Sequence, residues 1–190
     1  MCNPASFVIA RNGKKAFWSR LTDSHEEIIT EHKLVEMVAD KICIARVEIV
    51  PPCGDMTKPL KQWIFRTDQN ILPNWYDPKL AEKVCRGELK DWFASKVFLA
   101  GEHEIKEGLV YALGSSRVVA RDSSSVVAWG SSRVVARDSS SVEAWDSSRV
   151  VARDSSTIIQ IHSTPKITLS GWAVNIDRSG GKPVIRVTGE

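Results

Sequence analysis

The sequence predicts an α+β N-terminal domain over residues 1–106, a two-sided β-solenoid with 16 residues per coil over residues 107–162, and a β-rich end piece over residues 163–190. Two observations carry this prediction. The later part of the chain is built from octapeptides in which apolar and polar residues alternate, which is typical of short stacked strands. The first part has no repeat and mixes strand-like with helix-like patterns.

Composition and charge restrict the functional classes. Of the 190 residues, 43% are hydrophobic and 26% are charged, as in globular proteins. No apolar run reaches the roughly 18 residues of a transmembrane helix, so we expect a soluble protein with no membrane contact. The net charge of +3, from 26 basic and 23 acidic residues, is too small to predict nucleic-acid binding from overall electrostatics. Any argument from charge must therefore be local.

The segment Met1–Pro4 lacks the basic region, apolar stretch and cleavage site of a secretory signal, which favours a cytoplasmic location with reduced thiols. The four cysteines are Cys2, Cys43, Cys53 and Cys85. They form no CxxC pair, so neither a zinc site nor a disulfide framework is predicted. Cys43 and Cys85 lie in apolar patterns and are expected in the core.

The N-terminal domain opens with a predicted hairpin. Strand-like segments at Ser6–Ala10 and Lys15–Ser19 flank an Asn-Gly type turn at Arg11–Lys14. A helix is predicted from Ser24 to His32, because Ser-His-Glu-Glu matches the capping box S-x-x-E.

Further strands are expected over residues 42–50, 63–66 and 96–100, and a helix from Asp77 to about Ala94. In this helix Asp77 is the expected N-cap and Pro78 occupies the first helical position. Its residues available for packing are Leu80, Ala81, Val84, Leu89, Trp92 and Phe93.

The repeat covers residues 115–162 as six octapeptides: SSRVVARD, SSSVVAWG, SSRVVARD, SSSVEAWD, SSRVVARD and SSTIIQIH. The first, third and fifth are identical, and EGLVYALG at residues 107–114 fits the same frame, so the true period is 16. Each octapeptide supplies one strand and one turn, and two of them make one coil. Stacked coils give two parallel sheets, with ~4.8 Å between coils. A helix is disfavoured, because a period of eight does not match 3.6 and Ser, Asp and Val are poor helix formers.

Comparison of the octapeptides predicts which side chains face the interior. The fourth position is Val or Ile and the sixth is almost always Ala, whereas the third, fifth and seventh include Arg and Glu. Because burial of unpaired Arg or Glu is costly, the third, fifth and seventh positions must face outward. By the same parity the second-position serines face inward, where their hydroxyls can bond along a ladder or to turn backbone: Ser116, Ser124, Ser132, Ser140, Ser148 and Ser156.

The two outer faces differ, and both are candidate partner-binding surfaces. One presents a valine column between two arginine columns: Arg117, Arg121, Arg133, Arg137, Arg149 and Arg153. Stacked guanidinium groups can bind phosphates or an acidic protein surface. The alternative is that Asp122, Asp138 and Asp154 pair with the arginines and keep the sheet soluble.

The other face presents Trp129 and Trp145, with Ile161 continuing their column. Exposed tryptophans are typical of interfaces. The alternative is that they stack on each other between coils, or that the N-terminal region covers them.

An N-terminal catalytic site is a second possibility. Removal of Met1 would leave Cys2 with a free amine, which resembles the N-terminal-nucleophile hydrolases and the cysteine-initiated DNA-crosslinking domains; His25 would then be the base, oriented by Asp23 or Glu26. The structural alternative places Cys2 under the first strand and His25 on the surface. The motifs of those families are not evident and the histidines are scattered, so we predict no catalytic residue, metal or cofactor.

Several segments together are similar to proteins of phages and prophages with a C-terminal Ser-Ser-x-Val-x-Ala solenoid: MCNPASFVI, DSHEEIITEHKL, VEIVPPCGDMTKPLKQWIFRTDQNILPNWYD and the octapeptides. The likeness covers about residues 1–162. It implies a two-part architecture and a mobile-element origin, and hence the cytoplasm of a host bacterium. In that setting a bacterial defence complex is a plausible partner, as for anti-CRISPR proteins.

The predicted function is therefore that of a non-enzymatic, phage-encoded binding protein that acts through protein–protein contacts on a bacterial protein or ribonucleoprotein complex. A homodimer is a further expectation, because exposed Trp and an open solenoid edge favour self-association. The alternatives are an N-terminal cysteine enzyme or DNA-crosslinking module, and a nucleic-acid-binding protein that uses the arginines.

Overall fold

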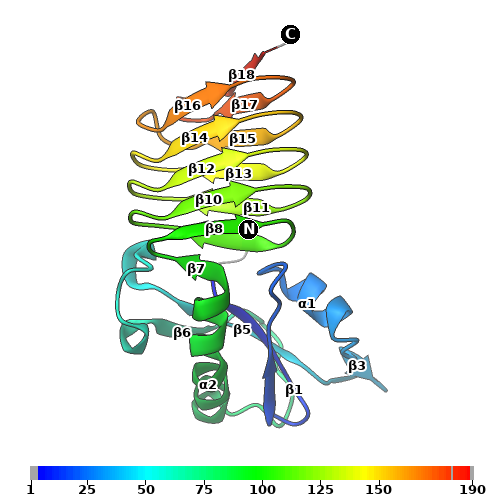
Figure 1. The fold of residues 1–190 in the computed structure, drawn as a ribbon. Helices are drawn as coiled ribbons and strands as arrows, with labels where there is room; N and C mark the ends of the chain where they lie inside the picture. Colours follow the sequence, from blue (N-terminus) through cyan, green and yellow to red (C-terminus); the bar gives the residue numbers. More distant parts are fainter. Residues whose placement is uncertain (1–3, 181, 189–190) are drawn as a thin grey trace. The chain divides into compact units, whose positions relative to one another are not determined.

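The computed structural model describes residues 4–180 and 182–188. The chain divides into two compact units, Met1–Ser95 and Lys96–Glu190. The first is an α+β domain, and the second is a β-solenoid with about 16 residues per coil (Figure 1). Both parts of the predicted fold class are confirmed.

The N-terminal unit is built on an antiparallel sheet with the strand order β2-β1-β5-β6. Its strands are β1 (Ser6–Ala10), β2 (Lys15–Phe17), β5 (Ala45–Val50) and β6 (Ile64–Thr67). The predicted hairpin is confirmed, and Arg11, Asn12 and Gly13 turn the chain with positive φ angles. Every residue of β1 is buried, so this strand is the centre of the domain.

The first helix, α1 (His25–Glu31), is also confirmed. The Ser24 hydroxyl oxygen accepts a hydrogen bond from the Glu27 backbone N–H, as the capping box predicts. Ile28 and Ile29 belong to the same buried cluster as Val8 of β1. The apolar side of α1 therefore packs in the core of the domain.

The strand predicted over residues 42–50 is interrupted. A short hairpin of β3 (Met37–Val38) and β4 (Lys41–Ile42) precedes β5, and Ala39 and Asp40 turn it with positive φ angles. The prediction that Cys43 lies in the core is wrong. It follows the hairpin, is half-buried, and its backbone N–H donates to the Glu36 carbonyl (2.8 Å).

The second helix, α2 (Pro78–Lys96), begins where Asp77 predicts, because the Asp77 carboxylate accepts from the backbone N–H of Lys79 (2.8 Å). Two 3-10 turns, η1 (Pro52–Gly54) and η2 (Leu60–Gln62), lie before it. Ala81, Cys85, Leu89 and Trp92 are buried and share one face of the helix, and Lys96 at its C-terminal end is also buried. Leu80, which was expected to pack, lies off this face and is 41% exposed.

The solenoid has two parallel sheets, and each full coil gives one strand to each. The five-stranded sheet has the order β16-β14-β12-β10-β8, and the seven-stranded sheet has the order β18-β17-β15-β13-β11-β9-β7. The strands are β7 (Val97–Phe98), β8 (Glu102–Ile105), β9 (Leu109–Ala112), β10 (Arg117–Ala120), β11 (Ser125–Ala128), β12 (Arg133–Ala136), β13 (Ser141–Ala144), β14 (Arg149–Ala152), β15 (Thr157–Gln160), β16 (Lys166–Leu169), β17 (Val174–Asp177) and β18 (Val184–Val187).

The solenoid is longer than the repeat, since it runs from residue 97 to residue 177. It starts before the predicted boundary at residue 107, and it takes in β16 and β17 of the predicted end piece. One inserted residue precedes β16, so Arg149 pairs with Lys166 and not with residue 165. Among the described strands of the solenoid, only β18 departs from the parallel stack, and it runs antiparallel along β17.

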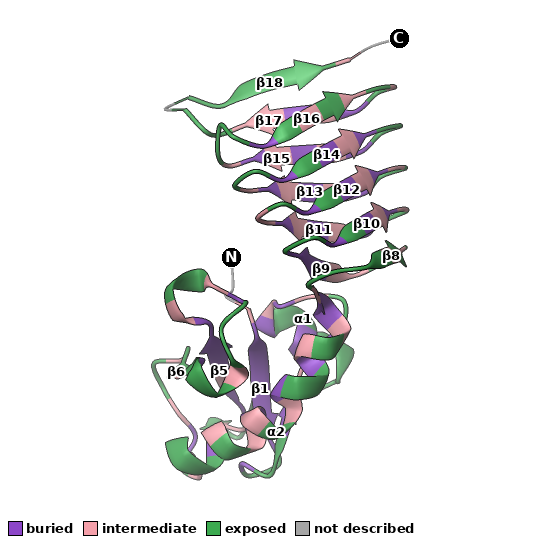
Figure 2. Ribbon diagram, turned by 60° about the vertical axis from the view of Figure 1, so that its left-hand side comes forward, coloured by how far each residue is buried: buried purple, intermediate pink, exposed green. Residues whose placement is uncertain are grey.

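The interior of the solenoid is the predicted stack of small side chains. Val118 is 1% exposed and Ala120 is 0% exposed, and the equivalent residues of the next coils form one continuous cluster. Buried and more exposed residues alternate along the repeat strands β10 to β15 (Figure 2). The parity argument from the octapeptides is confirmed.

The inward serines are buried as predicted, but they do not form a hydrogen-bond ladder. Ser124 donates through Oγ to the Arg121 carbonyl (2.7 Å). The other serine hydroxyl oxygens find no partner among the described residues: Ser116, Ser132, Ser140, Ser148 and Ser156. The fold therefore depends on the small size of these serines, because the interior of the solenoid is narrow.

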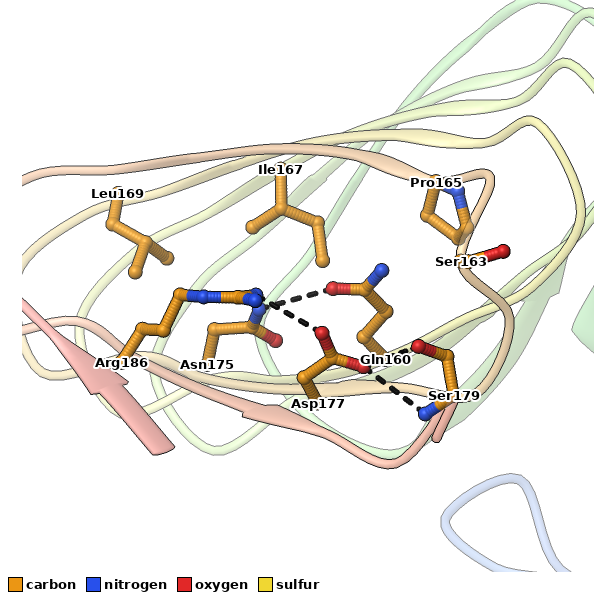
Figure 3. A pocket seen from close by; sticks show the side chains of 9 residues that line it. All are labelled: Gln160, Ser163, Pro165, Ile167, Leu169, Asn175, Asp177, Ser179 and Arg186. Atoms are coloured by element: carbon orange, nitrogen blue, oxygen red, sulfur yellow. Dashed lines mark hydrogen bonds and ion pairs between the residues drawn. The ribbon is translucent and has the colours of Figure 1, made fainter. Parts of the chain in front are cut away.

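The C-terminal end of the solenoid interior becomes polar. Gln160, Asn175 and Asp177 occupy inward positions that hold Val or Ala in earlier coils. Asn175 Nδ2 donates to Gln160 Oε1 (3.1 Å), and Arg186 of β18 donates to Asp177 Oδ2 (3.0 Å), around a cavity of about 410 Å³ (Figure 3). An apolar core is thus closed by hydrogen-bonding groups, as a terminal repeat requires.

Candidate functional site: the arginine face of the solenoid

We define the arginine face as the outward side of the five-stranded sheet: Arg117, Arg121, Arg133, Arg137, Arg149, Arg153, Lys166 and the valines Val119, Val135 and Val151. The parallel register aligns Arg117 with Arg133, then Arg149, then Lys166. Successive side chains in this column are therefore ~4.8 Å apart, the spacing of adjacent strands. The backbone ladder holds the column in place.

The valine column lies between the two arginine columns. Val119, Val135 and Val151 are half-buried. At the N-terminal part of the face a hollow of about 370 Å³ is lined by Arg117, Arg133 and valines of β10 and β12, and by Glu102 and His103 of β8. The face thus combines charge at its sides with an apolar centre.

Acidic partners are found only at one end of this face among the described residues. Arg117 pairs with Glu102 (3.0 Å) and Arg121 with Glu104 (2.7 Å), both from β8. Within the described part of the chain, no ion pair joins the remaining arginines to a carboxylate: Arg133, Arg137, Arg149 and Arg153. Beyond the first coil these guanidinium groups are therefore not held in a described ion pair and can bind acidic groups of a partner.

The aspartates of the turns have a different role from the one considered in the sequence analysis. Asp138 Oδ2 accepts from the Asp122 backbone N–H (3.3 Å), and Asp154 Oδ2 accepts from the Asp138 backbone N–H (3.3 Å). These residues also occupy the left-handed region, with φ angles between 50° and 56°. Because their carboxylates bond turn backbone from coil to coil, they do not pair with the arginines in the described structure.

The tryptophan face, the outward side of the seven-stranded sheet, is explained by contacts within the sheet. The Trp129 and Trp145 rings meet edge to face with centroids 5.8 Å apart, and Trp145 meets His162 at 5.1 Å. Stacking between coils, the alternative interpretation, is therefore what the structure shows. Ile161 follows Trp145 in the backbone ladder, as expected, and the neighbouring His162 adds a ring to the stack.

The structure describes His25 but not Cys2, which lies outside the described residues. His25 is 3% exposed, so the expected surface position is wrong. Its Nε2 lies 3.1 Å from the Val47 carbonyl oxygen and its Nδ1 lies 3.5 Å from Asp68 Oδ2. Glu48 also approaches, with the three candidate ligand atoms within 4.8 Å of one another.

The expected orienting residues of His25 are used elsewhere. Asp23 accepts from the Trp92 indole N–H (3.0 Å), and Glu26 accepts from Arg46 (2.8 Å). Both ring nitrogens of His25 lie near acceptor oxygens, and these contacts hold the ring in place. His25 is therefore a buried polar side chain that links α1 to the sheet.

Sequence reasoning found the arginine columns but missed Lys166, Glu102 and Glu104. The inserted residue before β16 hides Lys166 from the octapeptide frame. Glu102 and Glu104 could have been found from the alternation of Glu-His-Glu-Ile in β8, because this strand pairs in register with β10. Asp68 carried no local signal, because its contact with His25 is between distant segments.

Comparisons with models of protein families, with curated proteins and with solved structures found no match. In the described part of the chain, no helix has the length and apolar character needed to cross a membrane. The function of the arginine face is therefore inferred from its geometry.

Proposed function

We propose that the chain is a non-enzymatic binding protein that docks an acidic surface of a macromolecular partner onto its arginine face. The observation that carries the proposal is the set of arginines without acidic partners, held in register by a continuous parallel ladder. The sequence resemblance to phage proteins supports a bacterial protein or ribonucleoprotein complex, such as a defence complex in the host cytoplasm, as the partner.

The physical basis is preorganisation. A flat β-solenoid does not rearrange when it binds, so the entropic cost of docking is confined to the arginine side chains. Each guanidinium offers a planar fork of donors that matches a carboxylate. Several such forks at fixed spacing favour a partner whose acidic groups have a similar spacing.

A pull-down from bacterial lysate, followed by mass spectrometry, identifies the partner, and its affinity is then measured by calorimetry. We expect Arg133→Gln with Arg149→Gln to weaken binding at least tenfold. The matched control is Ser125→Gln with Ser141→Gln, at the same octapeptide position on the other sheet. Equal affinities of the arginine variant and the control would remove the arginine face as the contact surface.

Nucleic-acid binding is the second candidate, since regularly spaced guanidiniums can also contact phosphates. Salt separates the two, because the logarithm of a duplex-DNA association constant falls by about 0.9 per phosphate contact per logarithm of salt concentration. We expect no measurable affinity for duplex DNA at ~0.15 M salt. A tight DNA complex with a slope of about −4 would favour this second candidate.

The enzyme alternative is tested by Cys2→Ala. The binding proposal expects full partner affinity and full biological effect in a phage-protection assay. Loss of that effect, in a variant that still folds and still binds, would favour N-terminal cysteine chemistry.

A further inference from the structure

The arginine face has a defined width and a defined period. Along each strand the third and seventh octapeptide positions are four residues apart, or ~13 Å. Across strands the side chains repeat every ~4.8 Å, from Arg117 through Arg133 and Arg149 to Lys166. A ligand that uses the whole face must therefore be about as wide as the gap between the columns and must repeat with nearly the coil spacing.

From this geometry we infer that the element seated on the arginine face is an acidic amphipathic α-helix that lies along the solenoid axis. Its apolar stripe covers the column of Val119, Val135 and Val151, and its carboxylates face the arginines on both sides. The inference rests on the proposed function and names the chemistry of the partner.

A helix matches both dimensions. Its diameter with side chains is ~10–12 Å, and side chains on one face recur with each ~5.4 Å turn. The mismatch with the coil spacing is ~0.6 Å per step, or ~1.8 Å over the steps from Arg117 to Lys166, which long arginine side chains absorb.

Other elements fit less well. An extended strand along the same axis repeats its side chains every ~6.6 Å, so it loses register by nearly 2 Å per step. Duplex DNA presents phosphates without an apolar stripe, and would set them against the valines. The hollow of about 370 Å³ over β10 and β12, between Arg117 and Arg133, is instead the place for one aliphatic side chain of the helix.

The probe is a synthetic peptide of about 14 residues, ~21 Å as a helix, with a leucine stripe flanked by glutamates. A second peptide has the same composition with the stripe scrambled. Binding of both to the full-length protein is measured by fluorescence anisotropy at ~0.15 M salt. We expect the amphipathic peptide to bind at least tenfold more tightly than the scrambled one.

Variants of the valine column locate the peptide. Val135→Asp is expected to weaken the amphipathic peptide at least tenfold. Its control is Val127→Asn, at the same octapeptide position on the tryptophan face, which adds a polar group of the same size without a second carboxylate beside Glu143. Because a charge could disturb folding, Val135→Thr keeps the β-branched shape and is expected to weaken binding about threefold.

The outcomes separate this inference from the proposed function. If the arginine variant weakens the natural partner while both peptides bind equally, or Val135→Thr and Val135→Asp leave the peptide affinity unchanged, the helix is wrong and the arginine face stands. If the arginine variant also has no effect on the natural partner, both proposals fail. Tighter binding of duplex DNA than of the amphipathic peptide at the same salt overturns the helix as well.

Discussion

At the scale of single residues, Glu143 shows how the surroundings of a side chain change its pKa. It lies between Val127 and Ile159 in one column of the tryptophan face. Burial raises the pKa of the Glu143 carboxyl, and the opposing effects of Trp145 and Arg178 are smaller. Folding therefore shifts the Glu143 equilibrium towards the protonated form.

This predicts a pH dependence of stability. Because the folded pKa of Glu143 lies above its ordinary value of 4.5, its charged form destabilises the fold, and stability falls as pH rises from 4.5 through the raised pKa. We expect Glu143→Gln to raise the urea midpoint at pH 7 and to lose this advantage near pH 4. Exposed Glu107→Gln is the control, and an equal response of both variants would contradict the prediction.

The inward serines give a second prediction at this scale. Ser124→Ala removes a hydrogen bond to the Arg121 carbonyl and should cost about 1 kcal/mol of unfolding free energy. Ser140→Ala, at the equivalent position one coil on, removes a buried hydroxyl without a described partner and should be neutral or stabilising. Urea unfolding of the two variants checks the difference, and equal destabilisation would show that Ser140 is also bonded in solution.

At the residue scale, sequence reasoning succeeded where a single physical rule determines whether a side chain faces inward or outward. Arg117 and Glu143 cannot be buried without a partner, so the parity of the whole octapeptide followed. It did not find the environment of His25, because Asp68 and Val47 reach this ring only through tertiary structure. The orientation of a serine hydroxyl likewise depends on neighbours that the repeat does not encode.

At the scale of elements, the turns of the solenoid set the stack. Gly130 and Asp146 are equivalent turn residues of successive coils, and both have positive φ angles. Asp146 Oδ2 accepts from the Gly130 backbone N–H (3.4 Å), so an aspartate here links one turn to the previous one. Glycine allows the turn, and aspartate adds a bond between coils.

Two glycine substitutions are expected to have opposite effects. At Gly130 a Cβ meets nothing nearer than the Gly114 nitrogen at 3.8 Å, and Asp146 bears the same positive φ one coil later. A bond to that N–H should therefore outweigh the cost of this φ, and Gly130→Asp should stabilise the chain by at most about 1 kcal/mol. At Gly114 a Cβ lies 2.5 Å from the Leu99 carbonyl oxygen, so Gly114→Ala should cost about 2 kcal/mol or more. Thermal unfolding followed by circular dichroism measures both, and destabilisation by Gly130→Asp would refute the proposed link.

Elements were predictable where a cap or a repeat marks them. Ser24 and Asp77 placed the starts of α1 and α2, because each satisfies backbone N–H groups of the first turn. The β3–β4 hairpin was missed, because Ala39 carries no turn preference and still adopts a positive φ angle there. Short elements of this kind depend on packing rather than on local sequence.

At the scale of the whole molecule, the solenoid is a linear array in which each coil contacts its neighbours. The period of 16 and the identical octapeptides explain why this architecture could be derived from sequence alone. Its true extent could not, because β8 and β17 have lost the repeat residues and retain only the alternation.

The array predicts that whole coils can be removed. Deletion of residues 117–132 joins Ser116 to Arg133 and restores the same octapeptide frame. The shortened chain should keep its β-sheet circular dichroism and unfold at a lower temperature, because one inter-coil interface is lost. Partner affinity should fall as well, since the arginine face loses one rung. A chain that no longer folds would show that the coils are not interchangeable.

The reversal of direction at β18 has a further consequence. An open β-solenoid ends in an unpaired backbone edge that could template another solenoid and grow into a fibre, in the manner of cross-β assemblies. Because β18 lies antiparallel on β17, it covers the edge at which the parallel stack would otherwise continue. This short antiparallel strand therefore protects the solenoid from polymerisation at that edge.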